Sequence, residues 1–126
     1  MKIIIIGGVA GGATTAARIR RSDETAEIIL LEKGKYISYA NCGLPYYIGD
    51  VIEEREKLFV QTPEAFGVRF RVDVRTENEV IFIDRKKKTV TVRLKSEDTY
   101  EESYDKLLIS TGASPVPVSY THLTLP

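Results

Sequence analysis

One cysteine and one glycine-rich loop are the parts of this 126-residue chain whose residue types could perform chemistry. Cys42, the single cysteine, lies in the segment ISYANCGLPYY at residues 37–47, and the loop GGVAGG occupies residues 7–12. A glycine turn before a helix suits nucleotide phosphates, because it brings backbone amides and the positive end of the helix dipole close to them. A thiol near such a loop in the sequence indicates redox chemistry between sulfur and a cofactor.

The glycine loop matches the dinucleotide pattern G-x-G-x-x-G in part. Gly7 and Gly12 take the first and third glycine positions, while Val9 takes the middle one, and the two other glycines of the loop can supply the missing backbone freedom. Glu32 follows Gly12 at about the twenty-residue spacing at which an acid accepts hydrogen bonds from ribose hydroxyls and repels an NADP-type phosphate. The alternative is a tight loop followed by a solvated acidic strand end. The order of strand, loop, helix and acid favours nucleotide binding, without choosing FAD over NAD.

The surroundings of the cysteine favour an accessible thiol. Pro45 suits the first turn of a short helix, and a thiol at a helix N-terminus has its thiolate favoured. A lone cysteine is otherwise most often a small buried hydrophobe, but Ser38, Asn41 and Tyr46 make this segment polar. Because the chain has no second cysteine, a redox cycle at Cys42 must pass through a sulfenic acid or a mixed disulfide with an external thiol.

The first third of the chain has the pattern of a βαβ unit. Residues 2–6 form a continuous apolar run, which predicts a strand buried on both faces. Residues 13–21 predict a helix with arginines near its C-terminal end, and residues 27–31 predict a second apolar strand that ends at Glu32. This order is typical of a Rossmann-like α/β domain with right-handed crossovers.

The remainder predicts a small antiparallel meander inserted into that domain. From Phe66 onward apolar residues alternate with charged ones, which predicts a strand through residues 66–75. Residues 79–83 and 89–94 predict two more strands around a solvated lysine-rich turn. Residues 106–110 predict another apolar strand. The expected fold class is therefore α/β, with a βαβ start and an antiparallel β-meander.

Composition excludes several classes of protein. Lysine plus arginine and aspartate plus glutamate both total 18, so the absence of net charge gives no reason to expect nucleic acid or a membrane surface as a partner. A single cysteine excludes an internal disulfide and favours a cytoplasmic protein. No metal site is expected.

The end of the chain differs from the rest. Residues 118–126, VSYTHLTLP, have no charge and no periodic pattern. We expect native sequence to stop near Pro117 and residues 118–126 to be a non-native tail, which makes the chain a fragment. The alternative is a short native strand.

Four segments resemble the FAD-dependent pyridine nucleotide-disulfide oxidoreductases: IGGVAGG at 6–12, EKG at 32–34, SYANCGLPY at 38–46 and YDKLLISTGA at 104–113. They are most similar to its single-cysteine branch, which holds coenzyme A-disulfide reductases and related NADH oxidases. The resemblance covers residues 1–117, which would be the N-terminal part of an FAD-binding domain. It implies that Cys42 faces the flavin and that Asn41 steadies its thiolate.

The resemblance also implies binding residues. The ADP half of FAD would lie on the glycine loop and Glu32, with Lys33 near the adenosine and the Val80 backbone at the adenine. The implied cofactor-binding set is Gly7, Gly8, Val9, Ala10, Gly11, Gly12, Glu32, Lys33, Val80, Ser110, Thr111 and Gly112. The implied coenzyme A site holds Thr14, Arg18, Arg21, Ser38 and Asn41.

Arginines suit the phosphates of coenzyme A through charge-assisted forks, although helix-end capping is an equally good reason for Arg18 and Arg21. Family members use a basic residue where this chain has Phe70, which Arg69 and Arg71 flank.

The expected activity is reduction of coenzyme A disulfide or a related small disulfide, with NAD(P)H as donor. Peroxidases and many oxidases of the family carry a histidine where this chain has Ala10, which favours the disulfide as acceptor. Two alternatives stay open, an NADH oxidase that reduces oxygen through a Cys42 sulfenate and a non-catalytic nucleotide-binding sensor. The resemblance further implies a separate NAD(P)H domain and a homodimer, so we expect the 126 residues alone to bind FAD weakly and to be inactive.

Overall fold

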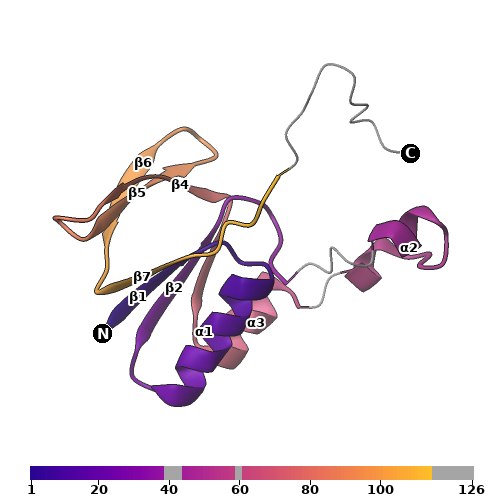
Figure 1. Ribbon diagram of the computed structural model, residues 1–126, viewed down its shortest axis with the longest axis horizontal. Coiled ribbons are helices and arrows are strands. Elements are labelled where there is room, and N and C mark those ends of the chain that lie inside the picture. Colours follow the sequence, from indigo (N-terminus) through magenta and orange to yellow (C-terminus); the bar gives the residue numbers. More distant parts are fainter. Residues whose placement is uncertain (39–43, 59–60, 115–126) are drawn as a thin grey trace.

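The computed structural model describes residues 1–38, 44–58 and 61–114. Within these ranges the chain forms two β-sheets and a set of helices (Figure 1). In chain order the elements are β1 (Lys2–Ile6), α1 (Ala10–Ser22), β2 (Glu27–Glu32), α2 (Leu44–Ile48), a 3₁₀ turn (Arg55–Leu58), α3 (Pro63–Phe70), β3 (Asp73–Thr76), β4 (Asn78–Asp84), β5 (Thr89–Leu94), β6 (Thr99–Ser103) and β7 (Lys106–Ile109). Cys42, Asn41, the boundary at Pro117 and the tail 118–126 lie outside the described residues.

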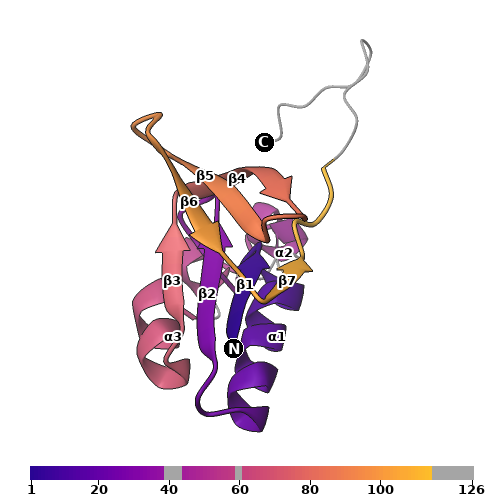
Figure 2. The same ribbon diagram turned by 90° about the vertical axis from the view of Figure 1, so that its left-hand side faces the viewer.

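The central sheet is parallel and has four strands in the order β3-β2-β1-β7 (Figure 2). Ile4 of β1 lies between Ile29 of β2 and Leu107 of β7. A second sheet, in the order β4-β5-β6, is antiparallel. The α/β class, the βαβ start and the antiparallel meander are therefore confirmed.

The parallel sheet is the middle one of three layers. Helices α1 and α3 cover one face, and the antiparallel sheet covers the other (Figure 1). Successive side chains of a strand point to opposite faces, so both faces of β1 and β2 must be apolar, which explains the continuous isoleucine runs. The helix-facing set includes Ile3, Ile5, Ile28 and Leu30, and the opposite set includes Ile4, Ile6, Ile29 and Leu31, packed on Val90 and Val92.

The prediction of a strand through residues 66–75 is wrong in its first half. Residues 63–70 form α3, because the Thr62 hydroxyl accepts a hydrogen bond from the Ala65 amide (3.2 Å) and Pro63 occupies the first turn. Phe66 and Phe70 are separated by four residues, and the distance between the centres of their rings is 4.8 Å, as expected on one face of a helix. Val68 is 82% exposed, although the alternation of apolar and charged residues predicted it on the buried face of a strand.

One strand pairing and one helix boundary also differ from the predictions. The strand after α3 is β3, which pairs with β2 in the parallel sheet and not with the meander. Its place in the meander is taken by β6. Helix α1 begins at Ala10 and not at Ala13, so two glycines of the loop lie in its first turn. None of the helices in the described ranges is long and apolar enough to cross a membrane.

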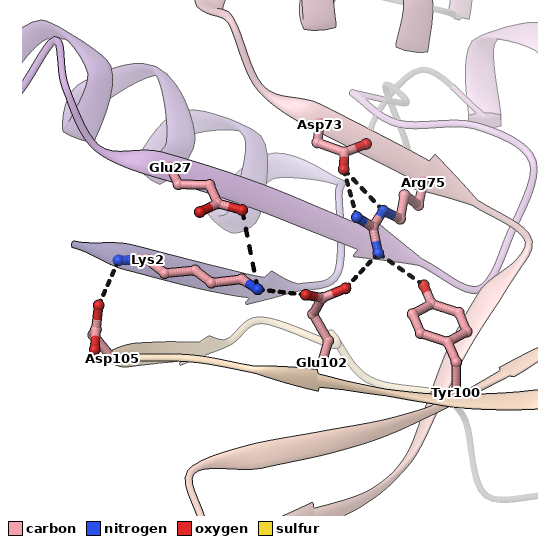
Figure 3. A network of polar contacts seen from close by, with 7 residues as sticks. All are labelled: Lys2, Glu27, Asp73, Arg75, Tyr100, Glu102 and Asp105. Carbon is pink, nitrogen blue, oxygen red and sulfur yellow. Dashed lines mark hydrogen bonds and ion pairs between the residues drawn. The ribbon is translucent and has the colours of Figure 1, made fainter.

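A network of charged side chains joins the two sheets (Figure 3). Glu102 on β6 accepts hydrogen bonds from the Lys2 ammonium on β1 and, at 2.8 Å, from the Arg75 guanidinium on β3. Arg75 also donates two hydrogen bonds, of 2.9 and 2.6 Å, to Asp73. Burial opposes ionisation of Glu102, but the hydrogen bonds from Lys2 and Arg75 outweigh it and lower the pKa of the carboxyl below its ordinary value.

We predict that this network makes the protein less stable in acid. Because the pKa of Glu102 is lower in the folded state, its contribution is complete above about pH 4.5 and is lost as the pH falls through the folded pKa. Glu102→Gln should lower the free energy of unfolding at pH 7 by about 1–3 kcal/mol, and this difference should shrink below about pH 4.5. Denaturant unfolding of the full-length protein at several pH values measures it. The exposed neighbour Glu101→Gln is the control, and a difference that stays constant from neutral to acid pH would contradict the assignment.

Candidate nucleotide-binding site

The glycine loop connects the carboxyl end of β1 to helix α1. Gly7 has a φ of 100°, in the region that disfavours side chains, and a Cβ there would lie 2.0 Å from the carbonyl oxygen of Ser110. A Cβ on Gly12 would lie 1.7 Å from the carbonyl oxygen of Gly7. Both positions therefore require glycine, because the helix start, the loop and the end of β7 are packed backbone against backbone.

The N-terminus of α1 is suited to an anion. The N-cap residue Val9 has a hydrocarbon side chain that accepts no hydrogen bond, and the first turn carries no acidic residue. The amides of the first helical turn, which have no partner within the helix, and the positive end of the helix dipole together favour an anion there. This donor set fits the pyrophosphate of a dinucleotide such as FAD.

Glu32 ends β2 and holds the loop in place. Its carboxylate, in a residue that is only 9% exposed, accepts hydrogen bonds from the amide of Gly8 (3.0 Å) and from the amide of Gly34 (2.6 Å). Glu32 is therefore not the solvated strand end of the alternative interpretation. Each carboxylate oxygen keeps a second lone pair, so a ribose contact stays possible in chemical terms and stays a prediction.

A cavity of about 150 Å³ lies where β1, β2 and β7 end and β4 begins. Five of the predicted cofactor residues line it together: Gly7, Glu32, Lys33, Val80 and Thr111. Ile6, Leu31, Asn78 and Glu79 complete the lining and were not predicted. The carboxyl ends of parallel strands are where α/β folds bind nucleotides, so the cavity has the expected position.

The other predicted cofactor residues do not line this cavity but are neighbours in sequence of Gly7 and Thr111, which do. Gly8, Val9, Ala10, Gly11 and Gly12 form the loop and the first turn of α1. The Ser110 amide donates to the carbonyl of Ile6 at 2.8 Å, and a Cβ on Gly11 would lie 2.5 Å from the Ser110 hydroxyl oxygen. Gly112 has a φ of 73° with open space beside it.

A second cavity of about 390 Å³ adjoins the first, since Lys33 and Glu79 line both. Glu79 accepts a hydrogen bond of 3.0 Å from Arg93, and this bond and the charge of Glu79 raise the pKa of Arg93. Both acidic and basic side chains line this second cavity, so it carries no strong charge of one sign.

The predicted substrate residues are brought only partly together. Thr14, Arg18 and Arg21 are exposed and follow one another at helical spacing on one face of α1. Ser38 lies at the glycine loop, where its amide donates to the carbonyl of Gly8 at 2.9 Å. Asn41, like Cys42, lies outside the described residues.

Phe70 lies on α3 and packs against the apolar core that the helices share with the parallel sheet. The Arg69 guanidinium lies 5.2 Å from the centre of its ring. The position at which the resemblance implies a basic residue is therefore apolar here, with a cation beside it.

The structural role of Arg20 was not predicted from the sequence. Arg20 is buried, and its guanidinium donates hydrogen bonds to the carbonyl oxygens of Phe70 (2.8 Å), Arg71 (2.8 Å) and Glu24 (2.7 Å). It therefore joins the end of α1 to the end of α3. The signal was present in the sequence, because Ala13, Ala16 and Arg20 share the buried face of α1 at helical spacing.

A parallel sheet with a glycine loop, a helix N-terminus and a cavity at the strand ends defines a Rossmann-like dinucleotide-binding protein. The family model for pyridine nucleotide-disulphide oxidoreductases matches residues 1–123. The chain belongs to this family.

Individual proteins and solved structures of this family are similar to the chain. The coenzyme A disulfide reductase of Staphylococcus epidermidis strain ATCC 35984 is 53% identical over 114 residues, which are 90% of this chain and 26% of that protein. The crystal structure of reduced Bacillus anthracis CoADR-RHD is 54% identical, with a TM-score of 0.91 over 94% of this chain and 21% of that one. The water-forming NADH oxidase of Lactobacillus brevis, bound to NADH, is 30% identical, with a TM-score of 0.88 over 94% of this chain and 26% of that one. The chain thus spans about a quarter of the length of the curated relatives it matches.

Proposed function

We propose that the full-length protein that carries this chain is an FAD-dependent NAD(P)H:disulfide oxidoreductase, and that its substrate is coenzyme A disulfide or a related small disulfide. The observation that carries the proposal is the cavity at the strand ends, where Gly7, Glu32, Val80 and Thr111 meet. Family membership and the identity of about one half to coenzyme A disulfide reductases support the same reaction.

The described residues fit the ADP half of FAD. The amides of the first turn of α1 bind the pyrophosphate, and Glu32 accepts hydrogen bonds from the ribose. Lys33 lies near the adenosine, and the Val80 backbone lies at the adenine. Residues 110–112 form the second flavin-binding segment. When bound, FAD supplies two-electron transfer from a nicotinamide to a disulfide.

Cys42 is the proposed nucleophile, and Asn41 steadies it. Its thiolate attacks one sulfur of the disulfide, which forms a mixed disulfide with Cys42 and releases the first thiolate. Two electrons that originate from NAD(P)H then cleave the mixed disulfide, release the second thiolate and restore Cys42. This cycle needs one protein thiol, and the chain contains one cysteine.

The substrate site that we propose lies along the exposed face of α1. Arg18 and Arg21 can form charge-assisted forks with the phosphates of coenzyme A, and Thr14 offers a hydroxyl on the same face. Ser38 lies at the glycine loop, near the start of this helix. The NAD(P)H domain and the homodimer belong to the same proposal.

A second candidate keeps the fold and makes oxygen the acceptor. It is favoured by the likeness to the Lactobacillus brevis oxidase, which matches 94% of this chain with a TM-score of 0.88. In this reaction Cys42 would cycle through a sulfenate.

Anaerobic turnover of the full-length protein separates these reactions. We expect a yellow protein that oxidises NAD(P)H only when coenzyme A disulfide is added and that releases both thiols. NAD(P)H oxidation in air without any disulfide, at a comparable rate, would replace this proposal with the oxidase. A colourless protein that binds no FAD would instead support the nucleotide-binding sensor.

A further inference from the structure

Asn78, the first residue of β4, lines the cavity at the strand ends and has no part in the site proposed so far. Its carboxamide is held on two sides. The Nδ2 group donates a hydrogen bond to the carbonyl oxygen of Thr76 (2.7 Å), and the Oδ1 atom accepts one from the hydroxyl of Tyr100 (2.7 Å). A polar side chain that is fixed in this way presents its remaining donor and acceptor in a defined direction.

The orientation of this amide follows from its partners. The Arg75 guanidinium donates a hydrogen bond to the Tyr100 hydroxyl oxygen (3.2 Å), and arginine has donors only. The single hydroxyl hydrogen of Tyr100 is therefore free to go to Asn78, which must present an oxygen to it. The Thr76 carbonyl only accepts, so it must face the NH₂ group. A flipped amide would place an oxygen against the Thr76 carbonyl oxygen, which loses that hydrogen bond, and would leave the Tyr100 hydroxyl hydrogen without its acceptor.

The network between the two sheets supports Tyr100 in turn. Arg75 is held by Asp73 and by Glu102, and the Tyr100 ring lies 5.7 Å from the guanidinium carbon (Figure 3). The hydroxyl of Tyr100 points toward this guanidinium (Figure 3). The contacts that join the sheets thus extend, through one hydroxyl, to the wall of the cavity.

One N–H group of Asn78 and one lone pair of its Oδ1 atom are left after these contacts. This donor–acceptor pair is complementary to the edge of adenine, which offers an amino group beside a ring nitrogen. Glu32, in contrast, offers acceptors alone and suits hydroxyl groups. Ile6, Leu31 and Val80 supply the apolar surface that a flat base needs.

We propose that Asn78 recognises the adenine edge of the bound dinucleotide and that Tyr100 is the positioning residue that sets the orientation of its amide. This inference rests on the proposed function, in which the cavity receives the ADP half of FAD. It adds a residue that distinguishes adenine from other bases at that site.

The test compares FAD with its hypoxanthine analogue, in which a carbonyl oxygen replaces the amino group and turns a donor into an acceptor. Apoprotein of the full-length enzyme is titrated with each flavin, and the ratio of the dissociation constants is measured. We expect the wild type to prefer FAD by about tenfold, Asn78→Leu to reduce this preference about fivefold and Tyr100→Phe about threefold. Tyr104→Phe is the control, because Tyr104 packs against the same core and lies outside the chain of contacts to Asn78.

The ratio separates recognition from a structural role. If Asn78 and Tyr100 only stabilised the fold, both flavins would bind more weakly by the same factor and the preference would not change, which would overturn the inference. Tyr100→Phe keeps the ring and its packing, so it tests the proposal even where Asn78→Leu does not fold. A wild-type protein that binds neither flavin would overturn the proposed function itself, and this inference with it.

Discussion

Replacing Gly12 by alanine is expected to weaken FAD binding by at least about a hundredfold. A Cβ at this position would lie 1.7 Å from the Gly7 carbonyl oxygen and 3.1 Å from a methyl carbon of Ile5. The nearer atom belongs to the backbone, so no rotamer change relieves the clash and the loop must move away from the helix. Because the amides of this loop and of the first helical turn form the proposed pyrophosphate cradle, its displacement removes several hydrogen bonds at once.

Flavin fluorescence during titration of the apoprotein measures this effect. Gly49→Ala is the matched control, since a Cβ there would lie 3.3 Å from its nearest neighbour, the Pro45 carbonyl oxygen, and a small shift accommodates it. Thermal unfolding of both variants shows how much of the loss is lost stability, to which overpacking contributes about 1–3 kcal/mol. Unchanged FAD affinity in Gly12→Ala would mean that the flavin does not bind at this loop.

Replacing Cys42 by serine is expected to lower the rate of disulfide reduction by at least about a thousandfold. A serine hydroxyl is not ionised at neutral pH and forms no mixed disulfide with the substrate, so the first step of the proposed cycle has no nucleophile. FAD content should stay unchanged, because the residues proposed to hold the ADP half of FAD, among them Gly7, Glu32 and Thr111, lie outside the cysteine segment.

The control is the reduction of ferricyanide by NAD(P)H, which needs the flavin and not the thiol. It should persist in Cys42→Ser while coenzyme A disulfide is no longer reduced. Disulfide reduction at the wild-type rate in this variant would exclude Cys42 as the redox sulfur. Loss of both reactions would point to a damaged fold, which the FAD content and the melting temperature would show.

Local patterns were sufficient for the elements that surround the site. The continuous apolar runs of β1 and β2 indicate strands buried on both faces, because successive side chains of a strand point to opposite faces and a parallel sheet is covered on both. Within six residues, the loop 7–12 contains the glycines for a tight turn, for close approach of the backbone to a phosphate and for the start of a helix. The sequence therefore predicts a dinucleotide-binding loop. The hairpin of β4 and β5 follows from alternation on both sides of a polar turn, and the structure confirms it.

Residues 63–70 show where local patterns were insufficient. Alternating apolar residues from Phe66 onward fit a strand, while Thr62 and Pro63 mark a helix start, and the two signals compete. Capping by Thr62 and the burial of Phe66 against the parallel sheet stabilise the helix over the strand. That choice in turn places β3 beside β2, a pairing that periodicity does not specify.

The sequence by itself determined the class of fold, the glycine loop and the single cysteine, because each depends on residues that are close along the chain. The tertiary structure alone added Asn78 to the wall of the cavity and decided the hydrogen bonds that support this wall. Asn78 and Tyr100 are separated by 22 residues, Gly8 and Glu32 by 24, and Arg20 and Phe70 by 50. Hydrogen bonds across such separations depend on how the sheets and helices pack together, and no short-range pattern of residue types encodes that packing.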